Sequence, residues 1–247
     1  MPDPVDTRWH GWAPCPAPPA TAGGGPWLEL SHVLRDDLSR VAAFPAARFE
    51  RLYAMPRDPM NATTMSMVCH YGTHVDAPCH FIPGAPAFHE IPLEHLHGPG
   101  VVWRLDCAPG GTITAAQLAH CTPAMRPGDL VLLDADWARR FGTPEYDDNP
   151  ALGVDAAEWL VAQGAKLVGV DFATPDLAVP RRPPGFAWPV HHILLGHGVL
   201  VAEHLTNLRP LAGRRIEAMF LGLAIAGSDA GPARVVARAV PDGAVAP

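Results

Sequence analysis

The chain concentrates its metal-binding side chains in one stretch, His70-Tyr71-Gly72-Thr73-His74-Val75-Asp76-Ala77-Pro78-Cys79-His80. The stretch places three histidines and one aspartate in the pattern H-x3-H-x-D-x3-H. Imidazole and carboxylate are groups with which proteins bind zinc, manganese and iron. The pattern therefore predicts a metal centre, with His70, His74 and Asp76 as candidate ligands.

Histidines four residues apart also occur on the exposed face of a helix, where they bind nothing. Two residues argue against a helix here, because Gly72 lies inside the run and Pro78 interrupts it. Thr73 and Val75 are β-branched and favour an extended chain. We expect a strand that ends near His70, followed by a tight loop that turns the ligands inward.

Length and composition describe an ordinary globular protein. The 247 residues suffice for one large domain with a substantial core, and 48% of them are hydrophobic. The net charge is −7, with only 18 lysines and arginines. Nucleic acids and anionic membranes select clustered basic residues, so we expect neither as a partner and expect a small-molecule substrate instead.

The cysteine pattern and the N-terminal sequence bear on location. The five cysteines form no C-x-x-C pair, which is simplest to explain as free thiols in a reducing cytoplasm. The N-terminal residues are acidic and proline-rich and lack the apolar core of a secretory signal. No run reaches the roughly 18 apolar residues of a membrane helix. We expect a cytoplasmic protein.

Strand-like and helix-like segments are mixed along the chain. Residues 1–26 are rich in proline and glycine and predict an N-terminal arm, and residues 27–247 predict a single domain. The expected strands are residues 27–31, 101–105, 129–134, 167–170, 199–203, 220–226 and 233–240. The expected helices are residues 114–120, with a threonine cap, 155–163, capped by Asp155, and 189–195. This mixture predicts an α/β or mixed α+β domain.

The eleven-residue stretch resembles the signature H-x-G-T-H-x-D-x-P-x-H of the cyclase family of metal-dependent hydrolases, which includes bacterial kynurenine formamidases and isatin hydrolases. The residues in register are His70, Gly72, Thr73, His74, Asp76, Pro78 and His80. Residues 159–171, 191–205 and 232–234 resemble later segments of the family. The resemblance covers about residues 27–240.

The resemblance implies a fold, an assembly and residue roles. The fold would be a swivelling β/β/α fold around a β-barrel-like sheet, in a homodimer or a larger homo-oligomer. Asp76 would bridge two metal ions in members that hold a pair. His80 matches the catalytic histidine of the family, and its role would be to take a proton from the attacking water and return it to the leaving group.

A second pair of candidate ligands lies far along the chain. His191 and Glu203 have the spacing that the resemblance implies for the remote metal-binding pair, with His192 as a competitor one residue away. Glu203 also ends a strongly apolar strand, where a charged group requires a partner such as a metal ion. An exposed strand end is the alternative for Glu203.

These residues predict a metal-dependent hydrolase that cleaves a C–N amide bond by metal-activated water. The favoured substrate is an aryl formamide such as N-formylkynurenine, and a cyclic amide such as isatin, or a lactone, stays open. Candidate substrate contacts are the aromatic residues Phe81, Trp137, Phe186 and Trp188 and the adjacent pair Arg181 and Arg182. Filling of the core and solvation at the surface are equally good accounts of these side chains.

Other classes of function stay open at this point. Two histidines and one carboxylate also form the facial triad of non-haem iron oxygenases, although His80 and the remote pair favour hydrolysis. A binding protein that keeps the fold and the metal without turnover is a third possibility. Zinc and manganese both accept these ligands, and the sequence does not separate one ion from two.

Overall fold

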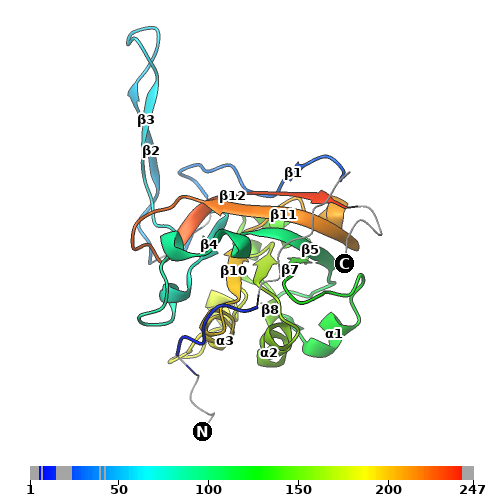
Figure 1. Cartoon of the computed structure of the whole chain (residues 1–247). Helices are drawn as coiled ribbons and strands as arrows, with labels where there is room; N and C mark the ends of the chain where they lie inside the picture. Colours follow the sequence, from blue (N-terminus) through cyan, green and yellow to red (C-terminus); the bar gives the residue numbers. More distant parts are fainter. Residues whose placement is uncertain (1–5, 7, 15–23, 39, 42, 241–247) are drawn as a thin grey trace.

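A closed sheet of seven strands forms the body of the protein (Figure 1). The computed structural model describes residues 6, 8–14, 24–38, 40–41 and 43–240. The strands of the closed sheet, in spatial order, are β12 (Ala230–Ala239), β11 (Arg214–Gly222), β5 (His97–Arg104), β7 (Leu130–Asp134), β9 (Leu167–Val170), β10 (Leu200–Glu203) and β4 (His74–Asp76). Pairing of β4 with β12 closes the ring. The predicted mixed α/β class with a barrel-like sheet is confirmed.

The strands β5, β7, β9 and β10 run parallel and carry the helices between them. The core strands β7, β9 and β10 are fully buried apolar runs, as expected for parallel strands covered on both faces. The helices α1 (Ala115–Ala119), α2 (Val154–Ala162) and α3 (Pro189–Gly196) lie on the same side of the sheet (Figure 1). The short strands β6 (Thr112–Ile113) and β8 (Ala151–Leu152) pair with each other, and β1 (Leu28–Glu29) extends the sheet beyond β12.

Of the two predicted helix caps, the threonine cap of α1 is confirmed and the Asp155 cap of α2 is wrong. Thr114 caps α1 by accepting a hydrogen bond from the backbone N–H of Gln117, as expected. Asp155 does not cap α2, because Gly153 occupies the cap position. The Asp155 carboxylate instead accepts a hydrogen bond from the backbone N–H of Ala115 at 2.9 Å. The residue therefore ties α2 to α1.

The strand expected to end near His70 was predicted wrongly, because the observed strand ends earlier and belongs to a separate hairpin. The strands β2 (Arg48–Tyr53) and β3 (Ala62–Ser66) form a hairpin that projects from the body, and β3 ends four residues before His70 (Figure 1). The residues His74 to Asp76, expected in a loop, form β4. Backbone pairing with β10 on one side and β12 on the other holds them extended.

The described part of the N-terminal segment packs against the body. The backbone N–H of His10 donates to the carbonyl of Gly196, and the His10 ring stacks on His197 at 4.1 Å. Gly198 has φ +72°, and a Cβ there would lie 2.3 Å from the Gly11 carbonyl oxygen, so the close approach requires glycine. Of the predicted arm, residues 1–5, 7 and 15–23 lie outside the described residues.

None of the described helices combines the length and the apolar character that a membrane span requires.

A buried ion pair joins β11 to the start of β7. The Arg215 guanidinium donates to both carboxylate oxygens of Asp129, at 2.9 and 2.6 Å, and both residues are buried. The Arg215→Ala substitution would leave the Asp129 carboxylate buried without a cation. We expect it to lower the free energy of unfolding by about 3–5 kcal/mol, measured by urea denaturation.

The matched control is Arg234→Ala, which removes the exposed ion pair with Glu29. This exposed pair is screened by solvent, so its loss should change the unfolding free energy little. An equal, small effect of both substitutions would contradict a stabilising role for the buried pair.

Candidate metal centre

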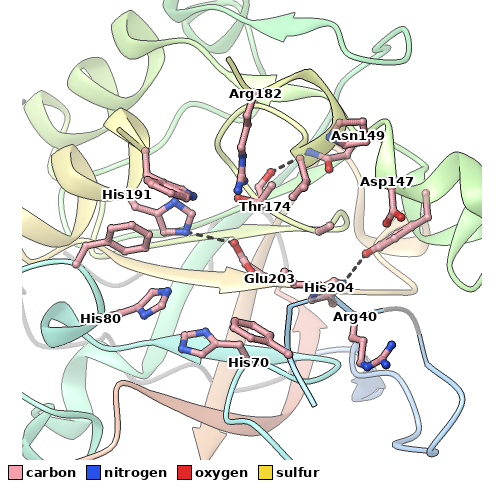
Figure 2. A pocket seen from close by; sticks show the side chains of 18 residues that line it. Arg40, His70, His80, Asp147, Asn149, Thr174, Arg182, His191, Glu203 and His204 are labelled. Atoms are coloured by element: carbon pink, nitrogen blue, oxygen red, sulfur yellow. Dashed lines mark hydrogen bonds and ion pairs between the residues drawn. The ribbon is translucent and has the colours of Figure 1, made fainter. Parts of the chain in front are cut away.

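Three polar side chains of the paired strands β4 and β10 face the same side of the sheet. The antiparallel register places His74 opposite Glu203 and Asp76 opposite Val201. Because alternate residues of a strand face the same side, His74, Asp76 and Glu203 converge. His191 reaches the same point from α3, and His70 reaches it from the loop before β4. All five candidate ligands predicted from the sequence are therefore brought together, and Figure 2 shows three of them, His70, His191 and Glu203.

The distances within this group fit metal ligands. The Nε2 atom of His74 lies 3.3 Å from Asp76 Oδ1 and 3.4 Å from Glu203 Oε2. The Nε2 atom of His191 lies 3.5 Å from Asp76 Oδ2 and 3.3 Å from Glu203 Oε1. Bonds of about 2.0–2.1 Å in a tetrahedral site place neighbouring ligand atoms roughly 3.3 Å apart.

The two oxygens of Asp76 face different partners. Oδ1 lies near His74 and 2.9 Å from the Nδ1 atom of His70, and Oδ2 lies near His191. Glu203 divides its oxygens between His74 and His191 in the same way. Both carboxylates therefore face His74 with one oxygen and His191 with the other, an arrangement that could serve one cation or two adjacent ones.

Several polar atoms of this group are buried without a hydrogen-bond partner. They are His74 Nε2, Asp76 Oδ1 and Asp76 Oδ2. Such atoms are costly unless something satisfies them, and a divalent cation would satisfy all three at once. The described residues therefore fit a metal ion at this point.

The electrostatics of the cluster also suit a cation. Burial lowers the pKa of His74, but the contacts with Asp76 and Glu203 outweigh burial and raise the pKa to about 10. Burial raises the pKa of Asp76, but the contacts with His191, His70 and His74 hold it well below its usual range. The carboxylates are thus ionised and attract positive charge, which is either protons on the imidazoles or a metal ion that displaces them.

A buried carboxylate that the sequence did not single out orients His191. Asp176 accepts a hydrogen bond from His191 Nδ1 at 2.6 Å and from the backbone N–H groups of Val190 and His191. This contact leaves Nε2 of His191 directed at Asp76 and Glu203, as in carboxylate–histidine–metal arrangements. His192, the competitor, points to another side of α3 and contacts Phe81.

His80 lies beside the candidate ligands. Its Nδ1 atom is 3.5 Å from Asp229 Oδ2, which also lies 3.1 Å from His70 Nε2. Burial lowers the pKa of His80 to about 4, so its imidazole is neutral at neutral pH and able to accept a proton. Asp229 lies just before β12, and only closure of the sheet brings it to His80, so no local pattern could have indicated it.

A cavity of about 460 Å³ opens above the candidate ligands (Figure 2). Two of the four predicted aromatic contacts line it, Phe81 and Trp188, and Phe81 stacks on His191 at 4.5 Å. Phe186 packs behind Trp188, and Trp137 is fully buried in the core, so neither lines the cavity. The prediction of an aromatic wall holds for two residues, and core filling explains Trp137.

The two predicted arginines have different surroundings. Arg181 forms an ion pair with Asp148 and lies away from the cavity. Arg182 is half-buried, points into the cavity and lies over the rings of Phe186 and Trp188 (Figure 2). Its Nε–H donates to the Leu177 carbonyl, and the described carboxylates that influence its charge, Asp176 and Glu203, form no direct ion pair with it.

Comparisons with known proteins agree with this geometry. A kynurenine formamidase from Bordetella petrii is 34% identical over 184 residues, which cover 74% of this chain and 83% of that protein. A kynurenine formamidase from Maricaulis maris is 29% identical, over 86% of this chain and 98% of that protein. Both similarities extend over most of each chain.

Solved structures share the fold. Isatin hydrolase A from Labrenzia aggregata superposes with a TM-score of 0.76 at 23% identity, over 87% of this chain and 94% of that chain. A predicted metal-dependent hydrolase from Bacillus stearothermophilus superposes with a TM-score of 0.70 at 25% identity, over 86% and 98%. The family model described as "Putative cyclase" matches residues 28–177. With more than half of its length matched, and with relatives above 30% identity, this chain belongs to the cyclase family.

Proposed function

We propose that this metal-dependent amide hydrolase opens the C–N bond of an aryl formamide such as N-formylkynurenine. The observation that carries the proposal is the convergence of His70, His74, Asp76, His191 and Glu203 at the floor of an aromatic-lined cavity. The kynurenine formamidase relatives support this substrate class. The isatin hydrolase neighbours share the fold, so a cyclic amide or a lactone is the second candidate.

The donor set supports hydrolysis over oxygenation. The facial triad of an iron oxygenase needs two histidines and one carboxylate. This site adds a second carboxylate, Glu203, and a third imidazole, His191, on the other oxygen of Asp76. This donor set would suit the activation of water for amide hydrolysis better than the activation of oxygen at one open iron.

The proposed ligands form two groups that share Asp76. Where two ions bind, His70 and His74 would hold one and His191 and Glu203 would hold the other. A bound divalent ion would lower the pKa of a coordinated water and polarise the amide carbonyl. Zinc or manganese as the ion, one or two ions, and a cytoplasmic location are further parts of the proposal.

The protein's own residues would handle the proton. His80, neutral because of its burial, would take the proton of the attacking water and deliver it to the leaving nitrogen. Asp229 lies beside His80 Nδ1 and would orient the ring during both steps. Phe81 and Trp188 would hold the aryl ring against the cavity wall.

Arg182 would recognise a carboxylate on the substrate. Its guanidinium lines the cavity and has no ion-pair partner among the described residues. A guanidinium and a carboxylate form two parallel hydrogen bonds, which adds both affinity and orientation. N-formylkynurenine carries such a carboxylate, and this feature favours it over isatin, which carries none.

The first prediction about function separates metal binding from proton transfer by comparing two variants. Asp76→Ala should lose the bound metal, because Asp76 contacts both proposed groups of ligands. His80→Ala should keep the metal and lose about 10²–10⁴-fold in kcat, the usual loss of a general acid–base group. Metal content and turnover of N-formylkynurenine are measured for both proteins. Full metal occupancy in Asp76→Ala, or metal loss in His80→Ala, would show that the roles are misassigned.

The second prediction concerns the substrate carboxylate. Arg182→Ala should raise KM for N-formyl-L-kynurenine roughly 10–100-fold, the worth of a charge-assisted hydrogen bond. The same variant should turn over formanilide, which lacks the carboxylate, like the wild type. Arg181→Ala, outside the cavity, is the matched control. A loss of turnover on both substrates would show that Arg182 maintains the structure of the site and does not recognise the substrate carboxylate.

We also propose that the protein is a homodimer, held through the projecting hairpin of β2 and β3. An isolated two-stranded hairpin is marginal in water, and this one exposes large apolar side chains. Leu52 is 55% exposed and Met65 is 56% exposed. A second copy of the chain would cover these side chains and stabilise the hairpin.

The third prediction tests this assembly. The double substitution Leu52→Ser and Met65→Ser should convert a dimer to a monomer, measured by light scattering after size exclusion. Leu93→Ser, at an apolar residue of similar exposure outside the hairpin, is the control and should leave the mass unchanged. A monomeric wild-type protein would refute the dimer directly.

A further inference from the structure

A histidine that follows the ligand Glu203 lies in the wall of the cavity. His204 is 8% exposed and lines the same cavity as His80 and His191 (Figure 2). One of its ring nitrogens lies within 4.8 Å of ligand atoms of His74 and Glu203. A polar group at this distance lies next to the place where a reacting carbonyl must sit.

The backbone of His204 is held in an uncommon conformation. Its φ is +55°, in the left-handed region that non-glycine residues rarely adopt. The surroundings fix this conformation from two sides. The N–H of His204 donates to the Phe172 carbonyl at 3.0 Å, and the Thr73 hydroxyl donates to the His204 carbonyl at 2.6 Å. Such conformations persist where neighbouring contacts over-determine them, and they cluster at functional sites.

The ring of His204 is fixed by a buried tyrosine. The Tyr146 hydroxyl lies 2.8 Å from Nδ1 of His204, and Tyr146 is fully buried. No other acceptor among the described residues lies within hydrogen-bond distance of this hydroxyl, so we assign its proton to the bond with Nδ1. Nδ1 is then the acceptor, and Nε2 carries the proton of the ring.

We propose that His204 donates a hydrogen bond from Nε2 to the amide oxygen of the substrate, with Tyr146 as the positioning residue that fixes the tautomer. The inference rests on the proposed amide hydrolysis. When water adds to the amide carbon, the electron pair of the C=O bond moves to the oxygen, which becomes negative. A fixed donor in a cavity shielded from water stabilises that charge strongly.

A role of His204 as a further metal ligand is disfavoured by the same hydrogen bond. A metal ion needs the lone pair of an imidazole nitrogen. In the tautomer assigned above, the Tyr146 hydroxyl occupies the lone pair of Nδ1, and the ring proton occupies Nε2. The two readings predict different metal contents for variants of His204, so they can be separated by measurement.

The fourth prediction uses three variants of the zinc-loaded enzyme. His204→Gly removes the donor and suits a φ of +55°, so the fold should be kept. We expect kcat for N-formylkynurenine to fall roughly 10²–10³-fold, with KM and zinc content nearly unchanged. His204→Asn keeps an N–H donor and tolerates this φ, and it should restore part of kcat. His120→Asn, at an exposed histidine outside the cavity, is the control.

The tautomer is measured independently of activity. Nitrogen-15 spectra of histidine-labelled protein should show His204 as the Nε2–H form in the wild type. Tyr146→Phe should populate the other tautomer and lower kcat while the zinc content stays the same.

Each contrary outcome has one meaning. Zinc loss in His204→Gly would make His204 a ligand, and an unchanged kcat or an Nδ1–H tautomer in the wild type would overturn the donor role. Wild-type turnover of isatin or a lactone alone would refute the proposed formamide substrate, and the same variants would then be compared on that substrate. A wild type without turnover on any of them would refute the proposed function, and this donor role with it.

Discussion

The whole site depends on one buried carboxylate, that of Asp76. This residue is fully buried, and the pairing of β4 with both β10 and β12 fixes its position in the closed sheet. A carboxylate out of water is costly unless positive charge compensates it. Three imidazoles surround it, but His74 and His191 already use Nδ1–H elsewhere, so their Nε2 atoms could donate to Asp76 only if these two rings were protonated. A bound metal ion would make protonation of the imidazoles unnecessary, because each imidazole and the carboxylate would then donate a lone pair to the metal.

The histidines of the site differ in role because their surroundings differ. His74 and His191 each donate their Nδ1–H to an oxygen, of Gly72 and Asp176 respectively, so Nε2 faces the carboxylates. His80 is held outside the carboxylate pair, and burial keeps it neutral. In the proposed tautomer, Nδ1 of His204 accepts a hydrogen bond from the Tyr146 hydroxyl, so Nε2 carries the ring proton and can donate it. In the proposed roles, one side-chain type would supply metal ligands, a proton acceptor and a hydrogen-bond donor, and the partner at the second nitrogen would decide which.

The sequence predicts the part of this site that is local. The candidate ligands of residues 70–80 could be proposed because their spacing is short and their chemistry is unusual. The segment just before them misled the prediction of the strand expected to end near His70, because its β-like composition continues to that residue and composition does not show where pairing ends. The positions of Asp176, Asp229 and Tyr146 could not be predicted, because closure of the sheet and the packing of loops bring them in from distant segments. Asp155 fails as a predicted cap for a related reason, since a neighbouring helix competes for its carboxylate.

The placement of His80 and His204 constrains how a substrate can lie. His80 comes from the turn after β4, and His204 comes from the end of β10, so the two imidazoles reach the cavity from different elements. A group that moves protons must face the water and the leaving nitrogen, whereas a donor must face the carbonyl oxygen. With Arg182 holding the carboxylate, the substrate would be held at three points, His80, His204 and Arg182, that are not in line (Figure 2). Three such contacts define one orientation of the C–N bond over the candidate ligands, and orientation of this kind supplies much of the rate that an enzyme gains.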